Sequence, residues 1–539
     1  MKEIKSFYVA SLLVAIVVFC SCIMGQKIRD FQHTDSGQGG IVTDTDFGLF
    51  LATQHALYVN DFTSASKMIA ATKNRTDASD QVKSLIDFFN GKTPENVSKL
   101  KDSKDLIESL IYDANLIQKD DWKTVYDRHK KDESIISAPL RAFSMAKLGK
   151  TKDAIKYIDS LKTNEFWKAF IRGQIAMLNN DIDGAAQEFA KVHPEFMNIN
   201  DYLYLMSFYQ KNGMIEDMEI LRNDFVAKPG GMYILKYPQI PDWSNYDEYK
   251  DNLVFSLIQT ISHNQFIIYT DLSLTFLRFA KVISNDANLD AINYYLGQYY
   301  VYNSGDYKSC FDKIEESSPL YLFSQLKSAE KNKDMKTIEK IARKNPLFIP
   351  AVNLAVRENI RTGNRHAALK KINRGLRQKN LPDQGRVYFL KQRAYINLMF
   401  KKAKSAQKDM DKIKEIDGSL NPDIMLLQSR IWEQQNRNLD DAYKYAMGLI
   451  KMNSSDVNAW DVLGLIVNKT ENIDNAIEIL ERVGDVATTS SLLYEHLGDL
   501  YMKKGNKDKA KRAYSQALDL SDDCLIVVPI VKQKLRKIK

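Results

Sequence analysis

The strongest constraint on the fold of this 539-residue chain is a fixed sequence interval that recurs near its C-terminus. Ala442, Ala476 and Ala510 are evenly spaced, and Gly464 and Gly498 are separated by the same interval. An interval of this length indicates a supersecondary unit stacked on copies of itself. The chain has only 12 Pro and 23 Gly and is 44% hydrophobic, which favours long helices around a continuous core.

Each unit has the pattern of two antiparallel helices. In the last unit, Gly498 and Tyr501 belong to a first helix, Gly505 to a turn, and Ala510 to a second helix. Small residues let two helices cross closely, large residues fill the space beside them, and glycine permits the tight turn. One earlier unit departs from the pattern, because Arg430 takes the place of the small residue in the first helix. The close packing of that crossing is therefore in question.

The pattern resembles the tetratricopeptide repeat. The residues that define it are Gly173, Ala185, Trp460, Gly464, Ala476, Gly498, Tyr501 and Ala510. The resemblance implies an all-α fold, a right-handed superhelical solenoid of antiparallel helix pairs whose concave surface binds segments of other proteins. In its layout the chain also resembles long envelope-associated repeat proteins of Gram-negative bacteria.

The chain divides into five predicted parts. These are a signal peptide or membrane anchor (1–26), a flexible tether (27–45), an N-terminal helical array (46–225), a break (226–252) and a C-terminal array (253–539), which has its clearest repeats in 423–520 and a basic tail. The break contains Pro229-Gly230-Gly231, Pro238 and Pro241, which interrupt helices, followed by several aromatic residues. We favour a loop whose aromatic side chains pack against the array. The alternative is a loop that lines or plugs the concave groove.

The N-terminus has the pattern of an export signal. Lys2 and Lys5 precede an uncharged, mostly apolar stretch, 6–26, which is also long enough to span a bilayer. Three outcomes remain open: an uncleaved anchor, cleavage around Gly25, or lipidation at Cys22. All three predict an exported protein of the cell envelope. An anchor or a lipid at Cys22 would in addition hold it at the membrane through its N-terminus, and we favour the periplasmic side for the array.

Positive charge is concentrated in residues 361–414, which contain 16 Lys or Arg and 3 Asp or Glu. This block is either a solvated convex face or a groove segment that captures an acidic peptide. The candidate partner-binding residues are Arg365, Lys370, Lys371, Arg374, Arg377, Lys401, Lys402 and Lys404. Nucleic acid is not an expected partner, because an exported protein would rarely meet it.

The sequence shows no constellation that points to catalysis. The seven histidines are scattered, and we find no phosphate-binding glycine loop and no nucleophile elbow. We therefore predict no catalytic residues, no metal and no cofactor. The predicted function is a non-enzymatic scaffold of the cell envelope that binds extended or helical protein segments, acidic ones among them. The alternative is a membrane-anchored, cytoplasm-facing regulatory or adaptor subunit of a metabolic or secretion complex, and an enzyme is the least favoured reading. The oligomeric state stays open.

Overall fold

The computed structural model describes most of residues 46–538. The residues left out of that range are 59–61, 74–75, 91, 93, 95–96, 104–105, 133–136, 238–247, 264–270, 285–287, 304, 487–489 and 522–525. The predicted signal or anchor (1–26), the tether (27–45) and Cys22 lie outside the described residues, as does the middle of the predicted break.

The chain forms two compact units, residues 1–87 and residues 88–539. The described secondary structure of the first unit consists of α2 (Asp46–Tyr58), α3 (Phe62–Ala71) and most of α4 (Asp77–Phe89). Buried alanine and aliphatic side chains from all three helices form its core: Ala56, Ala65, Ile69, Val82 and Ile86. The larger unit carries the features that bear on function.

The larger unit begins with a short 3₁₀ helix, η1 (Val97–Leu100), and four antiparallel helix pairs that we call the first array. Its helices are α5 (Leu106–Gln118), α6 (Trp122–His129), α7 (Ala138–Lys147), α8 (Thr151–Ser160), α9 (Glu165–Leu178), α10 (Ile182–Phe189), α11 (Ile199–Lys211) and α12 (Ile215–Ala227). Two 3₁₀ helices accompany them, η2 (Pro194–Phe196) before α11 and η3 (Met232–Lys236) after α12. The helices α13 (Tyr249–Ser262) and α14 (Asp271–Ile283) then follow.

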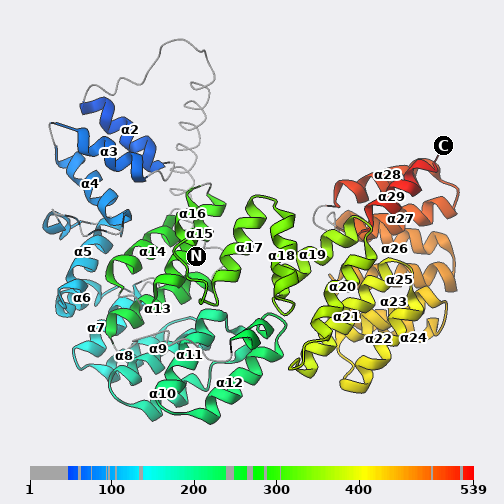
Figure 1. Ribbon diagram of the computed structural model, residues 1–539, viewed down its shortest axis with the longest axis horizontal. Helices are drawn as coiled ribbons and strands as arrows, with labels where there is room; N and C mark the ends of the chain where they lie inside the picture. The colour runs from blue at the N-terminus through cyan, green and yellow to red at the C-terminus, as the bar shows by residue number, and fades with distance from the viewer. Residues whose placement is uncertain are drawn as a thin grey trace, which may run out of the picture. The chain divides into compact units, whose positions relative to one another are not determined.

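Seven further pairs and a last helix make up the second array (Figure 1). Its helices are α15 (Leu289–Tyr302), α16 (Tyr307–Phe311), α17 (Tyr321–Lys331), α18 (Met335–Lys344), α19 (Ile349–Arg361), α20 (Arg365–Leu376), α21 (Asp383–Met399), α22 (Ala403–Ile416), α23 (Pro422–Gln435), α24 (Leu439–Met452), α25 (Val457–Thr470), α26 (Ile473–Val486), α27 (Ser491–Lys503), α28 (Lys507–Asp519) and α29 (Val528–Arg536). The described residues contain no β-strand. The predicted fold class, an all-α superhelical solenoid of antiparallel helix pairs, is confirmed.

Small residues of the first helix of a pair face large residues of the second. A Cβ atom added at Gly173 would lie 2.4 Å from Cε1 of Phe189, and one at Gly498 would lie 2.5 Å from the Tyr514 ring. The missing side chain therefore lets α9 approach α10, and α27 approach α28, as the repeat pattern predicts. In the pair of α23 and α24, Arg430 stands at the glycine position, and the small, fully buried Ala446 stands at the position of the large residue. In that pair the large side chain thus belongs to the first helix and the small one to the second, the reverse of the arrangement at Gly498 and Tyr514.

The turns inside the pairs share a local design. The residue that ends a first helix often adopts a positive φ, such as Gly505 (82°) or Asn180 (61°), and a capping Asp or Asn then starts the second helix. The side chain of Asn506, for example, accepts a hydrogen bond from the Lys509 backbone N–H. The left-handed residue reverses the chain, and the cap satisfies a backbone donor at the new helix start.

Packing between the pairs distinguishes an inner helix layer from an outer one. In the second array, the first helices α21, α23, α25 and α27 contact one another from pair to pair, whereas contacts between successive second helices are sparse. The first helices therefore line the concave side of the array, and the second helices α20, α22, α24, α26 and α28 lie on its convex side. This arrangement decides which side chains can line a groove.

Both sides of the predicted break, 226–252, belong to the larger compact unit. After η3, the helices α13 and α14 fold back onto the first helices of the first array: α13 contacts α7 and α9, and α14 contacts α5. Near this junction, the side chain of Met232 in η3 packs against Gly385 of α21, where an added Cβ would lie 2.5 Å from its sulfur. The described part of the break therefore packs against both arrays.

Candidate partner-binding groove

The concave side of the second array holds a groove of about 870 Å³, which we call the C-terminal groove. Its lining residues come almost entirely from the first helices α19, α21, α23, α25 and α27. Half-buried apolar side chains such as Leu426, Leu465 and Leu492 lie among polar ones, including Asn353, Asn458 and Asn468. A mixed surface of this kind can bind both the apolar face and the polar edge of a protein segment.

A buried ionic network ties three of these helices together. Nδ1 of His496 in α27 lies 2.7 Å from Oδ1 of Asp461 in α25, and Arg430 of α23 lies 3.1 Å from the other carboxylate oxygen. Burial alone would raise the pKa of the Asp461 carboxyl, but His496 and Arg430 outweigh it, and the pKa lies below its ordinary value. The carboxylate is therefore ionised at neutral pH and fixes the spacing of α23, α25 and α27.

A second ionic cluster fastens the C-terminal helix to the end of the groove. Nζ of Lys534 in α29 lies 2.8 Å from Glu495 and 2.7 Å from Asp499, which both line the groove. Burial alone would lower the pKa of Lys534, but the two carboxylates raise it above its ordinary value. The predicted basic tail is thus partly engaged in structure, while Lys532 and Arg536 are exposed.

The carboxylates of the groove are already paired, and three of its basic groups are not. Glu433 pairs with Lys469 at 2.8 Å, and Glu495 and Asp499 share the ammonium group of Lys534. Within the described residues, the exposed Arg357 and Lys401 make no ion pair, and Lys503 makes only a 2.9 Å hydrogen bond to Asn468. The uncompensated charge of the groove is therefore positive.

The predicted basic segment lies mostly outside this groove. Of its eight residues, only Lys401 is among the side chains that line the groove. Lys370, Arg377, Lys402 and Lys404 are exposed on or beside the second helices α20 and α22, and Arg374 is half-buried in α20. Lys371 is buried and pairs with Glu339 at 2.8 Å, and Arg365 donates to Asn397 at 2.7 Å. The block is thus chiefly a convex and structural feature.

The equivalent face of the first array, its N-terminal groove, is occupied by α13. Oγ of Ser256 donates to Oε1 of Gln174 in α9 at 2.7 Å, and the Tyr204 hydroxyl of α11 donates to Oδ1 of Asn252 at 2.6 Å. Nε1 of Trp167 donates to Oγ1 of Thr260 at 3.1 Å. The polar side chains of α13 recur about once per helical turn and meet the first helices as a bound helical partner would.

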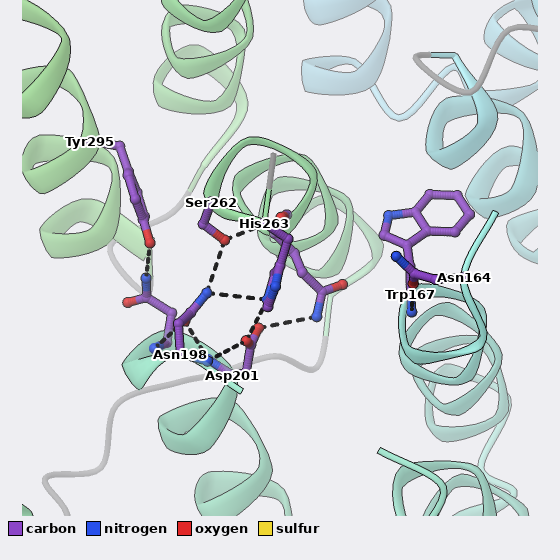
Figure 2. A network of polar contacts seen from close by, with 9 residues as sticks. Asn164, Trp167, Asn198, Asp201, Ser262, His263 and Tyr295 are labelled. Carbon is purple, nitrogen blue, oxygen red and sulfur yellow. Dashed lines mark hydrogen bonds and ion pairs between the residues drawn. The ribbon is translucent and has the colours of Figure 1, made fainter. Parts of the chain in front are cut away.

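The C-terminal end of α13 is held by the network in Figure 2. Nε2 of His263 lies 2.6 Å from Asp201, and Asn198 donates to Oγ of Ser262 at 3.0 Å. Asn198 and Asp201 form the capping box of α11, so the start of one helix binds the end of the other. This network is a structural clamp, and the N-terminal groove offers no free surface where α13 lies.

Among the described residues, no group of three or more His, Cys, Asp or Glu side chains could hold a metal ion. In the same part of the chain, no helix is both long and apolar enough to cross a membrane.

Residues 451–539 match the family described as "Tetratricopeptide repeat-like domain". This C-terminal segment therefore contains a tetratricopeptide repeat-like domain. The matched segment covers α25 to α29, which include the C-terminal half of the groove and the Lys534 cluster. The repeat-defining alanines Ala185, Ala476 and Ala510 are fully buried between helices.

Solved structures that resemble this chain do so distantly. A tetratricopeptide repeat protein from Parabacteroides merdae is 16% identical, covers 53% of this chain and 98% of its own, and has a TM-score of 0.29. The APC/C hetero-tetramer Cut9-Hcn1 is 14% identical with coverages of 92% and 96% and a TM-score of 0.32. Naa15/Naa10 bound to HypK-THB is 12% identical with coverages of 92% and 90% and a TM-score of 0.25. None of the curated proteins matches the sequence.

Most residues that build the C-terminal groove were not predicted from the sequence. Asp461, Glu495 and Asp499 were not predicted, because a single carboxylate forms no recognisable sequence motif. The sequence did contain a signal for Arg430. This residue stands one repeat interval before Gly464 and two before Gly498, so it occupies the repeat position that faces the crossing of two helices. A charged residue at such a position must find a buried partner.

Proposed function

We propose that this protein is a non-enzymatic interaction scaffold that binds a segment of a partner protein in the C-terminal groove. The observation that carries the proposal is the groove of about 870 Å³ along five successive first helices, with apolar side chains and uncompensated basic groups. Tetratricopeptide-repeat proteins commonly bind protein segments along this surface, which supports the proposal.

The charges of the groove define the partner. Because Arg357, Lys401 and Lys503 make no ion pair among the described residues, the segment they attract is acidic. Because Leu426, Leu465 and Leu492 lie between them, the segment also carries apolar side chains. The proposed ligand is therefore an acidic, amphipathic stretch of another protein.

Site-specific photo-crosslinking in the native cell tests this proposal. A photoreactive phenylalanine analogue at Leu465 should form a discrete crosslinked product, and the same analogue at the exposed Lys408 of the convex helix α22 should not. A Leu426→Glu variant should abolish the product at position 465 while the helical circular dichroism is retained. Equal crosslinking at both positions, or persistence in the variant, would contradict binding in the groove.

We further propose that the protein resides in the cell envelope, with the arrays on the periplasmic side and its N-terminus at the membrane. The support is the basic start and the uncharged stretch 6–26 of the sequence. A reporter enzyme fused after Lys539 distinguishes this location from the cytoplasm-facing adaptor. A periplasm-dependent reporter should be active, and activity only of a cytosolic reporter would exclude the proposed topology.

A further inference from the structure

A smaller pocket of about 440 Å³, the side pocket, lies where two irregular parts of the sequence meet. Tyr233, Leu235 and Lys236 come from η3 in the predicted break, and 378–380 come from the basic block just after α20. The turn between α18 and α19 completes the wall. The side pocket is distinct from the C-terminal groove, because the two share no lining residue.

Positive charge borders the side pocket without any negative charge to balance it. Lys236, Lys344 and Lys379 line it, and none of its described lining residues is an Asp or Glu. In the described part of the chain none of the three lysines makes an ion pair, and Lys236 donates a 3.2 Å hydrogen bond to the amide oxygen of Asn345. Three ammonium groups at one opening attract an anion.

Much of the remaining wall is apolar, and the amide side chains of Asn345, Gln378 and Asn380 complete it. The Tyr233 ring packs edge-on against Phe323 at 5.3 Å and against Phe348 at 5.5 Å, measured between ring centroids. Leu235, Leu322 and Leu347 also line the pocket. Such a wall suits a hydrocarbon or aromatic body and offers it little conformational adjustment.

We propose that the side pocket binds a small amphipathic anion, with its phosphate or carboxylate head at Lys236, Lys344 and Lys379 and its apolar body against the Tyr233 wall. The volume of about 440 Å³ falls within the range of roughly 300–1,000 Å³ found for small-molecule sites. The site goes beyond the proposed scaffold function, because it takes a small molecule on a surface that the groove does not use.

Binding of four probes to the purified full-length protein tests both halves of the ligand. Decyl phosphate and decanoate carry the two candidate heads on the same tail, decanol lacks the charge, and inorganic phosphate lacks the tail. At least one of the two amphipathic anions should bind about tenfold more tightly than both decanol and inorganic phosphate. Comparison of decyl phosphate with decanoate then identifies the preferred head.

Two variants connect the affinity to this pocket. Lys344→Gln/Lys379→Gln should weaken binding of the preferred anion by about tenfold or more. The matched control Lys308→Gln/Lys331→Gln removes the same charge from two exposed residues that do not line the pocket and should leave the affinity unchanged.

The proposal fails if decanol or inorganic phosphate binds as tightly as both amphipathic anions. It also fails if Lys344→Gln/Lys379→Gln binds like its control.

Discussion

Asp461 and His496 join the neighbouring first helices α25 and α27 through a contact of 2.7 Å, although 35 residues separate them in the sequence. Arg430 extends the contact to α23, so one buried carboxylate is shared by three successive repeats. Because Asp461 is 2% exposed, these two partners replace water around its carboxylate. One buried side chain therefore links three of the helices that line the groove.

Asp461→Asn should destabilise the protein by about 3 kcal/mol, because it leaves Arg430 without its buried counter-charge. The free energy of unfolding, measured by urea titration, gives the change. Asp440→Asn, at an exposed position in the first turn of α24, is the matched control and should have little effect. A loss in Asp461→Asn no larger than in the control would mean that the network contributes nothing.

The same carboxylate predicts a pH dependence. Its pKa in the folded protein lies below the ordinary value of 3.8, so the ionised group stabilises the fold above the unfolded-state pKa. This contribution is lost as the pH falls through the folded-state pKa. Urea titrations from about pH 6 downward should therefore show a steeper acid loss of stability in the wild-type protein than in Asp461→Asn. Parallel acid profiles of the two proteins would contradict the lowered pKa.

Gly498→Ala should destabilise the second array by about 1–3 kcal/mol, because the new Cβ would lie 2.5 Å from the Tyr514 ring. Gly448→Ala is the control, since there the nearest atom is the flexible end of Met425 at 3.3 Å; better helix propensity should stabilise it by up to about 1 kcal/mol. A double-mutant cycle of Gly498→Ala with Tyr514→Ala should show strong coupling. Additive effects of the two substitutions would place the strain elsewhere.

Ser256→Ala should loosen α13 in the N-terminal groove, at a cost of about 1–3 kcal/mol, because the buried Oε1 of Gln174 loses its donor. Hydrogen exchange should accelerate in 249–262 and in 165–178 alike, since the two segments share the bond. Ser160→Ala, at an exposed serine that bonds its own helix backbone, serves as the control. Faster exchange confined to 249–262 would show that α9 does not depend on α13.

Reversal of the groove charges should weaken partner capture. Arg357→Glu/Lys401→Glu/Lys503→Glu should lower the yield of the crosslinked product at position 465 by about tenfold, and the effect should shrink at high salt. The control Lys370→Glu/Lys404→Glu/Lys408→Glu makes the same charge change on the convex helices α20 and α22. An equal loss in both triple variants would indicate overall charge rather than the groove.

The sequence was sufficient to predict the helix pairs and their crossings. Gly498, Ala510 and Ala476 stand in the register that close helix packing requires, so local pattern and tertiary contact agree. A repeat carries this information many times over, since each unit meets similar neighbours. The same logic extends to the aromatic residues of the break: Tyr233 packs against the array, as the favoured loop interpretation predicts.

The contacts that depart from the repeat pattern could not be predicted from the sequence. Nothing in Asn252 or Ser256 signals that α13 lies in the N-terminal groove, because an amphipathic helix can pack against any suitable face. The sequence also could not show that Lys371 is buried beside Glu339, whereas Lys401 lines the C-terminal groove. The sequence shows the charge of a residue. The side of the solenoid on which that residue lies depends on where each helix begins and ends, which the sequence locates only to within a few residues.

The return of α13 and α14 onto the first array affects when this part of the protein can fold during synthesis. Gln118 donates a 2.8 Å hydrogen bond to the carbonyl of Val282, 164 residues later, whereas an ordinary repeat contacts only its neighbours. At the usual rate of about 5–20 residues per second, Ile283 is polymerised roughly 5–20 s after Leu178. For that interval the nascent chain presents the inner faces of α5, α7 and α9 uncovered, and these are the surfaces on which a chaperone would act first.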